Sequence, residues 1–348
     1  MKNWLYIIYI VLMGAFVSSC QQSLDEEVQI PTASGKAQIS FTIALDDIES
    51  RATWEDNEGS TSAVVGAEQE NAIDLTSEDG LKVFVYSTTG TLLGEVTNKE
   101  VRKVDTNVYK FNGQLVIENL TTSTLQCRLM VYANCIESDE TFDFNVQYIP
   151  MWGVKETTLQ LAKGELTQLT EPIYLLRSMA KVEVKLADNI ADDFDLSSVD
   201  VDKYNTTGNV LPFGASTATD TKNLKQIDVF NVYSSYDEEN SPLRFTEDKD
   251  ENGEGTGVFY VYLPEYKNVD DDGNELTSAS KMAVFINDKD YTLEFKNYID
   301  NIPFNIVRNH YYQYVITSVT ENEVEVELSL RYQVMDWSEI TNIPMEFN

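Results

Sequence analysis

The segment Ile39-Ser40-Phe41-Thr42-Ile43-Ala44-Leu45 alternates large apolar side chains with small or polar ones. Successive side chains of a β-strand point to opposite faces, so this period of two predicts a strand with one buried face. The same alternation recurs over residues 180–186 and 324–332, and helical spacing of apolar residues is nearly absent after residue 36. The sequence therefore predicts an all-β protein.

The chain of 348 residues is long enough for two domains, each with a core of its own. A new alternating strand begins at Ala180, shortly after Glu171-Pro172, which places the predicted boundary near residue 176. We therefore predict two tandem antiparallel β-sandwich domains, one over residues 37–175 and one over residues 176–348.

Other stretches refine this picture. Near-continuous apolar runs predict central strands covered on both faces, over residues 81–86, 258–263 and 282–286. Residues 287–290 carry turn signals and predict a hairpin after the last of these runs. Stretches rich in Asp, Glu, Gly, Ser and Thr offer little apolar surface to pack, which predicts exposed loops over residues 54–72, 214–224 and 246–257.

At the N-terminus, an apolar run from Trp4 to Phe16 precedes Val17-Ser18-Ser19-Cys20. This run is too short for the roughly 30 Å hydrocarbon core of a bilayer, which takes about 20 residues, and small residues precede the cysteine as a signal peptidase requires. We predict a lipoprotein signal peptide over residues 1–19 and a diacylated, palmitate-bearing Cys20 that opens an acidic leader over residues 20–36. The alternatives are an ordinary secretory peptide cleaved elsewhere and an uncleaved membrane anchor.

The charge of the chain restricts its partners. It carries 58 acidic and 25 basic residues, for a formal net charge of −33. Phosphate binding needs clustered Lys and Arg, so nucleic acid is not expected as a partner. Like-charged copies at a cell surface resist nonspecific association, which suits this composition.

The residues give no support for an enzyme. His310 is the single histidine, and a Ser-His-Asp or Cys-His mechanism would have to use it. Apart from Cys20 the cysteines are Cys127 and Cys135, which in one extended strand lie roughly 27 Å apart, too far for a disulfide. We expect both to be buried core thiols on one face, and neither a zinc site nor any other cofactor is predicted.

One acidic stretch has the beginnings of a calcium loop. Asp248-Lys249-Asp250-Glu251-Asn252-Gly253 places oxygen ligands on alternate residues and glycine at the turn. Phe259 stands where the closing bidentate glutamate of such a loop belongs, and no flanking helices are predicted. The sequence favours a solvated acidic loop and leaves calcium binding open.

The order of these features resembles one known family, the fimbrillins, which are the subunits of the type V pili of Bacteroidales. The acidic stretch Gln21–Glu27 also resembles the signal that exports Bacteroidetes lipoproteins to the outer face of the outer membrane. The resemblance covers most of the chain and depends on six features in this order. They are the lipobox ending at Cys20, the strand Ile39–Leu45, the arginine in Glu49-Ser50-Arg51-Ala52-Thr53, the segment Asn71–Thr76, the segment Arg177–Val182 at the domain junction, and the closing strand with Trp337.

This resemblance implies a fold, a location and an assembly mechanism. It implies transthyretin-like β-sandwiches, surface display at the outer membrane in a fimbrium, and lipid attachment through Cys20 in the precursor. It also implies that an arginine-specific surface protease cuts between Arg51 and Ala52, releasing the first strand, and that another copy or a related subunit fills the groove with its C-terminal strand. The released strand would bury Ile39, Phe41, Ile43 and Leu45, and the donor strand would offer Val324, Val326, Leu328, Leu330, Tyr332 and Val334.

Elementary energetics makes such an exchange plausible. Burial of a large apolar side chain contributes about 1.5–3 kcal/mol, so the four large side chains of the first strand contribute on the order of 6–12 kcal/mol. This is comparable with the net stability of a whole domain, about 5–15 kcal/mol. Loss of the strand without a replacement should leave an exposed, aggregation-prone edge.

Two other functions remain open from the sequence. Within the same family, an anchor or accessory subunit would keep its lipid and its first strand. From another class, a surface glycan-binding lipoprotein would share the anchor and the β-sandwiches and would stack sugars on exposed aromatic side chains, with Trp54, Trp152 and Trp337 as candidates.

Overall fold

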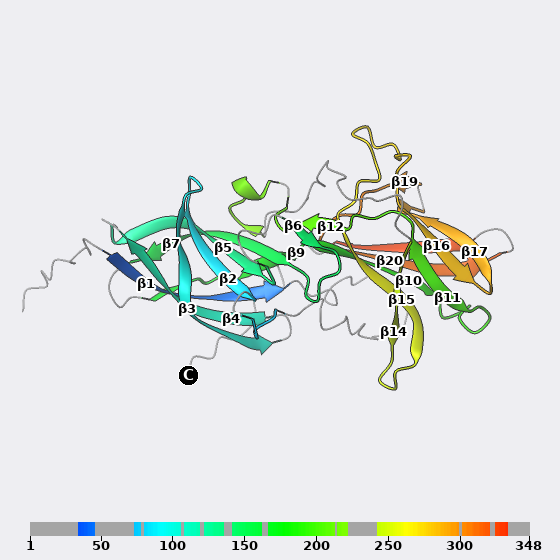
Figure 1. Ribbon diagram of the computed structural model, residues 1–348, viewed down its shortest axis with the longest axis horizontal. Coiled ribbons are helices and arrows are strands. Elements are labelled where there is room, and N and C mark those ends of the chain that lie inside the picture. The colour runs from blue at the N-terminus through cyan, green and yellow to red at the C-terminus, as the bar shows by residue number, and fades with distance from the viewer. Residues whose placement is uncertain are drawn as a thin grey trace, which may run out of the picture.

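The computed structural model describes residues 34–45, 73–77, 80–105, 108–118, 122–135, 141–161, 166–212, 214–221, 242–298, 301–320 and 324–332. The predicted all-β fold is confirmed, because apart from one short 3-10 helix, Ala215–Thr217, the described elements are β-strands. Figure 1 shows an elongated molecule with strands grouped at its two ends. We call these groups the first lobe and the second lobe.

The first lobe is built on one eight-stranded sheet with the order β4-β3-β2-β5-β7-β9-β1-β8. An additional pairing of β1 with β4 joins the two ends of this order, so the strands return on themselves around a core. The strands are β1 (Ser34–Leu45), β2 (Leu81–Ser87), β3 (Leu92–Asp105), β4 (Val108–Glu118), β5 (Thr124–Ala133), β7 (Met151–Gln160), β8 (Leu166–Gln168) and β9 (Ile173–Arg177).

The second lobe contains a five-stranded sheet, β14-β15-β10-β20-β21, and a four-stranded sheet, β13-β11-β16-β17, which contribute to one apolar core. A two-stranded ribbon, β18 (Lys296–Asn297) with β19 (Ile302–Pro303), lies beside them. The strands of the two sheets are β10 (Met179–Leu186), β11 (Leu196–Val201), β13 (Leu243–Arg244), β14 (Thr246–Lys249), β15 (Gly255–Pro264), β16 (Lys281–Ile286), β17 (Lys289–Glu294), β20 (His310–Val319) and β21 (Val324–Tyr332).

Between the lobes, two short strands that are distant in sequence pair with each other. They are β6 (Thr141–Asp143) and β12 (Thr207–Asn209), and Figure 1 shows them between the two groups of strands. A third apolar cluster gathers here, with the fully buried Trp152 from β7 and Val210 just after β12. The lobes are therefore joined by packing as well as by the chain.

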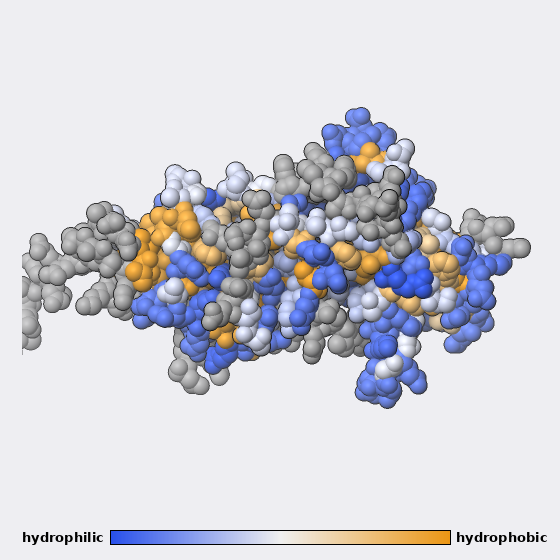
Figure 2. Space-filling model, in the orientation of Figure 1, coloured by the Kyte–Doolittle hydropathy of each residue, from blue (hydrophilic) through white to orange (hydrophobic). Residues whose placement is uncertain are grey.

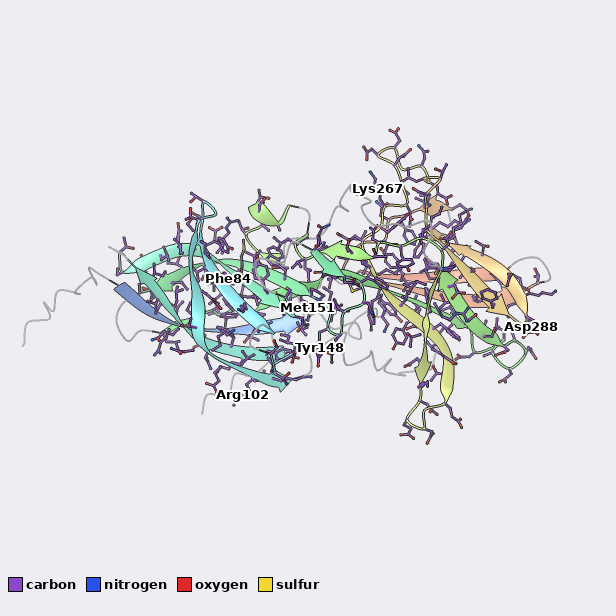
Figure 3. All side chains as sticks on the ribbon, in the orientation of Figure 1. Phe84, Arg102, Tyr148, Met151, Lys267 and Asp288 are labelled. Atoms are coloured by element: carbon purple, nitrogen blue, oxygen red, sulfur yellow. The ribbon has the colours of Figure 1, made fainter. Side chains whose placement is uncertain are left out.

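Several predictions about individual segments are confirmed. Strands occupy residues 39–45, 180–186 and 324–332, and Asn287 and Asp288, both at positive φ, form the turn of the predicted hairpin. Figure 3 shows Asp288 at the end of the second lobe that faces away from the first. Among the described residues, no helix has the length and apolar character needed to cross a bilayer.

Four predictions about loops and central strands are wrong in part, although residues 246–257 are largely exposed and both apolar runs lie in interior strands of their sheets, as predicted. Residues 246–257 form the hairpin of β14 and β15, turning through Gly253 at φ 81°. In the predicted loop over residues 214–224, Ala215 and Ala218 are buried against the junction cluster. The runs 258–263 and 282–286 lie in β15 and β16, where fully buried side chains of the second lobe's core alternate with partly buried ones, so only one face of each strand is fully covered.

The two lobes differ in the hydropathy of their surfaces. Figure 2 shows hydrophilic residues over the projecting loops of the second lobe and hydrophobic patches over parts of the first lobe. The exposed large apolar residues of the first lobe include Val116 on β4 and Leu166 on β8.

Candidate strand-exchange site

Strand β1 occupies the position that completes the first lobe's sheet. It pairs antiparallel with β4 through eleven residue pairs, from Ser34 opposite Glu118 to Ala44 opposite Val108. Its other edge pairs in parallel with β8 at residues 38–40 and with β9 at residues 43–45. β1 is therefore hydrogen-bonded along both edges, and its removal would open two strand edges at once.

The inward face of β1 is buried throughout. Exposed fractions are 0% for Ala37, Ile39 and Ile43, 2% for Phe41 and 3% for Leu45. Phe41 stacks on Phe111 of β4 with ring centroids 4.7 Å apart. The predicted burial of the four large side chains of this strand is confirmed, and they form part of the central core of the lobe.

The chain that follows residues 46–72 is also fixed to the first lobe. Ile73 is 5% exposed in the central core, and its N–H donates to the hydroxyl of Tyr109 at 3.5 Å. Burial raises the pKa of Tyr109, which stands opposite Ile43 in the β1–β4 register. The N–H of Asp74 donates to Oδ1 of Asn134 at 2.9 Å. The covalent link between β1 and the rest of the lobe therefore joins two anchored ends.

Strand β21 lies at the edge of the five-stranded sheet. Its one partner among the described strands is β20, with Val324 opposite Val319 and Tyr332 opposite His310. The register sets Val326, Leu328 and Leu330 opposite Ile316, Tyr314 and Tyr312, which belong to the core of the second lobe. Among the described strands, β21 is thus paired along one edge only.

Some predicted site residues lie outside the described residues. These are Cys20, Arg51, Ala52 and Val334, together with the side chains of Val326, Leu328, Leu330 and Tyr332, whose backbone is described as strand. Trp54 and Trp337 also lie outside. Trp152 is 0% exposed, so it has no face available for a sugar.

The acidic stretches form hydrogen-bonded turns. A side-chain oxygen of Asp250 accepts the N–H groups of Asn252 and Glu254 at 2.9 and 2.8 Å, and these bonds lower its pKa. Asp270 accepts from Asp272 and Asn274 in the same way. Across the described ranges, no group of three His, Cys, Asp or Glu side chains is placed to hold a metal ion.

Cys127 and Cys135 are buried thiols outside any disulfide, as predicted, but they do not share one cluster. Cys127 packs in the central core of the first lobe, whereas Cys135 packs in the junction cluster. The reason is that β5 ends at Ala133 and Asn134 follows at φ 60°, which breaks the alternation between them. Burial raises the pKa of Cys127 to about 12.

Sequence reasoning missed a buried ion pair near the junction. Arg308 Nη2 lies 2.8 Å from Glu265 Oε2, and the side chains are 1% and 6% exposed. Arg308 also donates to the carbonyl oxygens of Asn209 and Val210, next to β12. His310 is half-buried, and its Nδ1 lies 2.8 Å from the carbonyl oxygen of Arg308. A signal for this site was Arg308-Asn309-His310, a polar triplet at the start of a core strand.

No protein-family model matches the chain, and a search of curated proteins finds no match either. Among solved structures, the chain is similar to a putative cell adhesion protein from Bacteroides uniformis, with 11% identity and a TM-score of 0.47, covering 86% of this chain and 98% of that one. It is also similar to a fimbrial assembly protein from Parabacteroides distasonis, with 13% identity and a TM-score of 0.46, covering 85% and 100%. At such identities and TM-scores the likeness carries no argument about function.

Proposed function

We propose that this chain is a structural subunit of a cell-surface pilus that polymerises by protease-triggered exchange of strand β1 for the C-terminal strand of another copy. The observation that carries the proposal is the difference in pairing between the two strands. In the part of the chain that the structure describes, β1 is bonded along both edges in the first lobe, whereas β21 is bonded along one edge in the second. Transfer of β21 into the vacated place of β1 would give it a second ladder of hydrogen bonds.

The energetics favours this direction once the place is empty. Each backbone hydrogen bond contributes about 0.5–1.5 kcal/mol net, and a second ladder adds several of them. The vacancy is lined by apolar residues such as Phe111 and Leu115, both 0% exposed while β1 is present. A strand with the same period of two covers that surface again, so the main chain supplies affinity and the alternate side chains supply specificity.

A head-to-tail contact of this kind does not close on itself. The acceptor surface lies in the first lobe and the donor strand in the second, so each added copy presents a fresh vacancy or a fresh donor. Heterologous contacts that fail to close produce filaments. The elongated arrangement of the two lobes suits a pilus stalk (Figure 1).

The remaining parts of the proposal come from the sequence and its fimbrillin resemblance. The subunit is secreted as a lipoprotein anchored to the outer membrane through Cys20, and an arginine-specific protease cuts between Arg51 and Ala52. The two lobes correspond to transthyretin-like sandwich domains over residues 37–175 and 176–348. The partners are other copies and related fimbrial subunits, with no nucleic acid and no enzymatic activity.

The deciding experiment treats the purified precursor with an arginine-specific protease. The expected product has Ala52 as its new N-terminus and forms a ladder of oligomers on denaturing gels run without boiling. An Arg51→Gln variant is the matched control and should remain monomeric. If assembled fimbriae still carry residues 37–51 and acylated Cys20, the chain is an anchor or accessory subunit and the stalk assignment is wrong.

A further inference from the structure

We propose that the positions vacated by Ser40 and Ala37 of β1 define one register and one direction for the incoming donor strand, in which Ser329 takes the place of Ser40 and Val326 takes the place of Ala37. This inference rests on the proposed strand exchange and goes beyond it, because the exchange alone allows several registers. The donor is β21 of a second copy of this chain.

Ser40 is an unusual position on the outward face of β1. Along that face Gln38 is exposed and Thr42 and Ala44 are half-buried, but Ser40 is only 4% exposed. Its carbonyl oxygen accepts the N–H of Leu169 at 3.0 Å, and its backbone pairs with Asn112 of β4 on one side and Gln168 of β8 on the other. The vacated place therefore accepts a small side chain here and encloses it.

The sequence of the donor offers one small residue on the matching face. In the alternation of the sequence, Val326, Leu328 and Leu330 share one face of the strand, and the intervening residues, which share the other, are Glu325, Glu327, Ser329 and Arg331. A register that sets Glu325, Glu327 or Arg331 at the position of Ser40 would bury an unpaired charge, which is strongly unfavourable. Ser329 is the residue that fits.

The direction of the donor follows from the inward face. With Ser329 at the place of Ser40 and the strand running as β1 runs, Val326 replaces Ala37, which is 0% exposed. If the donor ran in the reverse direction with Ser329 still at the place of Ser40, Tyr332 would lie at the place of Ala37. Inserting an aromatic ring into a packed position is destabilising. The donor should therefore run antiparallel to β4 and parallel to β9, as β1 does.

The other inward positions are compatible with this register. Leu328 replaces Ile39, and Leu330 replaces Phe41, which removes the ring that stacks on Phe111. Tyr332 replaces Ile43 two positions further on, so an aromatic ring is restored next to the one that is lost. Val334, which lies outside the described residues, would follow at the place of Leu45.

One contact opposes this register and is weaker than the buried charge. Thr42 stands opposite Lys110 in the β1–β4 ladder, so Arg331 would face a like charge there. Lys110 is half-buried, and both long side chains can extend their charged ends into water. A repulsion between partly solvated ends is small compared with an enclosed, unpaired carboxylate. Ser329 therefore decides the register.

The test is disulfide trapping in the polymer that forms after the full-length precursor has been cleaved. A double variant with Asn112→Cys and Ser329→Cys places the two cysteines directly opposite each other in the proposed register, with Cα atoms about 4.5–5.5 Å apart, within the range of a disulfide. A second double variant with Asn112→Cys and Glu327→Cys places them diagonally, about 7–8 Å apart. The native Cys127 and Cys135 are buried, so the added cysteines are the reactive ones.

The proposed register predicts a series of disulfide-linked oligomers from the first double variant and little or no cross-linking from the second. A substitution pair supplies a second readout. Ser329→Glu should slow polymerisation by about tenfold or more, whereas Glu327→Ser should change it less than about twofold, provided that urea unfolding shows both precursors folded. Efficient trapping through position 327, or acceleration by Glu327→Ser, would overturn the register while leaving strand exchange intact. Failure of the unmodified cleaved chain to polymerise would overturn both.

Discussion

Replacement of Phe41 by alanine should destabilise the precursor and leave the assembled polymer unchanged. Phe41 is 2% exposed and stacks on Phe111 with centroids 4.7 Å apart and planes inclined by 28°. Truncation of a buried phenylalanine to alanine costs about 3–5 kcal/mol, of which stacking accounts for about 0.5–1.5 kcal/mol. This is a large part of the roughly 5–15 kcal/mol that stabilises an ordinary domain. Under the proposed exchange the polymer lacks β1, so it would no longer carry the substitution.

The assay compares two quantities for the same variant. Urea unfolding of the uncleaved chain gives the loss of stability of the precursor, as a lower midpoint with an unchanged slope. Thermal dissociation of the polymer in detergent gives the stability of the assembled state. Phe111→Ala on β4 is the matched control, because it removes the other half of the stack and should weaken both states. Equal loss of polymer stability from Phe41→Ala and Phe111→Ala would refute the idea that β1 is a temporary plug.

Three further predictions test other parts of the structure. Arg308→Leu leaves the buried carboxylate of Glu265 without its ion-pair partner and should lower the free energy of unfolding in urea by about 3–5 kcal/mol. Arg244→Leu, at an exposed ion pair, should lower it by less than about 1 kcal/mol. Similar losses for both variants would contradict the burial of the first pair. Because burial raises the pKa of Cys127 to about 12, a thiol reagent at neutral pH should modify it only after unfolding, and rapid modification of the native chain would argue against a closed core. Burial lowers the pKa of His310 below its ordinary 6.5, so the imidazole binds a proton more tightly in the unfolded chain than in the folded one. The free energy of unfolding should therefore be unaffected by His310 above about pH 6.5 and should fall as the pH drops below that value. His310→Gln should reduce this fall.

The strands of this protein could be predicted from its sequence because their information is local. Alternation over a few residues determines which side chains share a face, and residues 39–45 and 180–186 show it clearly. The hairpin at residues 246–257 is not predicted by composition, because its acidic residues are equally typical of an exposed loop. Asn252-Gly253, with Gly253 at φ 81°, is a turn signal that composition alone obscures.

The pairing of strands could not be predicted, because it depends on contacts between distant residues. Nothing near residue 40 indicates that β4, more than sixty residues away, lies on one side and β8 and β9 on the other. Burial of Ser40 was also hidden, since a serine in an alternating strand ordinarily faces solvent. The same applies to the pair of Arg308 and Glu265, whose charges would suggest exposure in any local reading.

The connection between β1 and the lobe gives a physical reason why a cut could act as the trigger. While residues 46–72 are intact, β1 and its place belong to one molecule, and its effective concentration there exceeds that of any donor from another copy. Cleavage leaves every contact of β1 unchanged, because Ile73 and Asp74 hold the following chain to the lobe independently. What changes is that a released β1 is diluted, whereas a donor strand stays tethered to a subunit that binds next in line. Under the proposed exchange, cleavage of one peptide bond would therefore be enough to permit polymerisation without any rearrangement of the acceptor sheet.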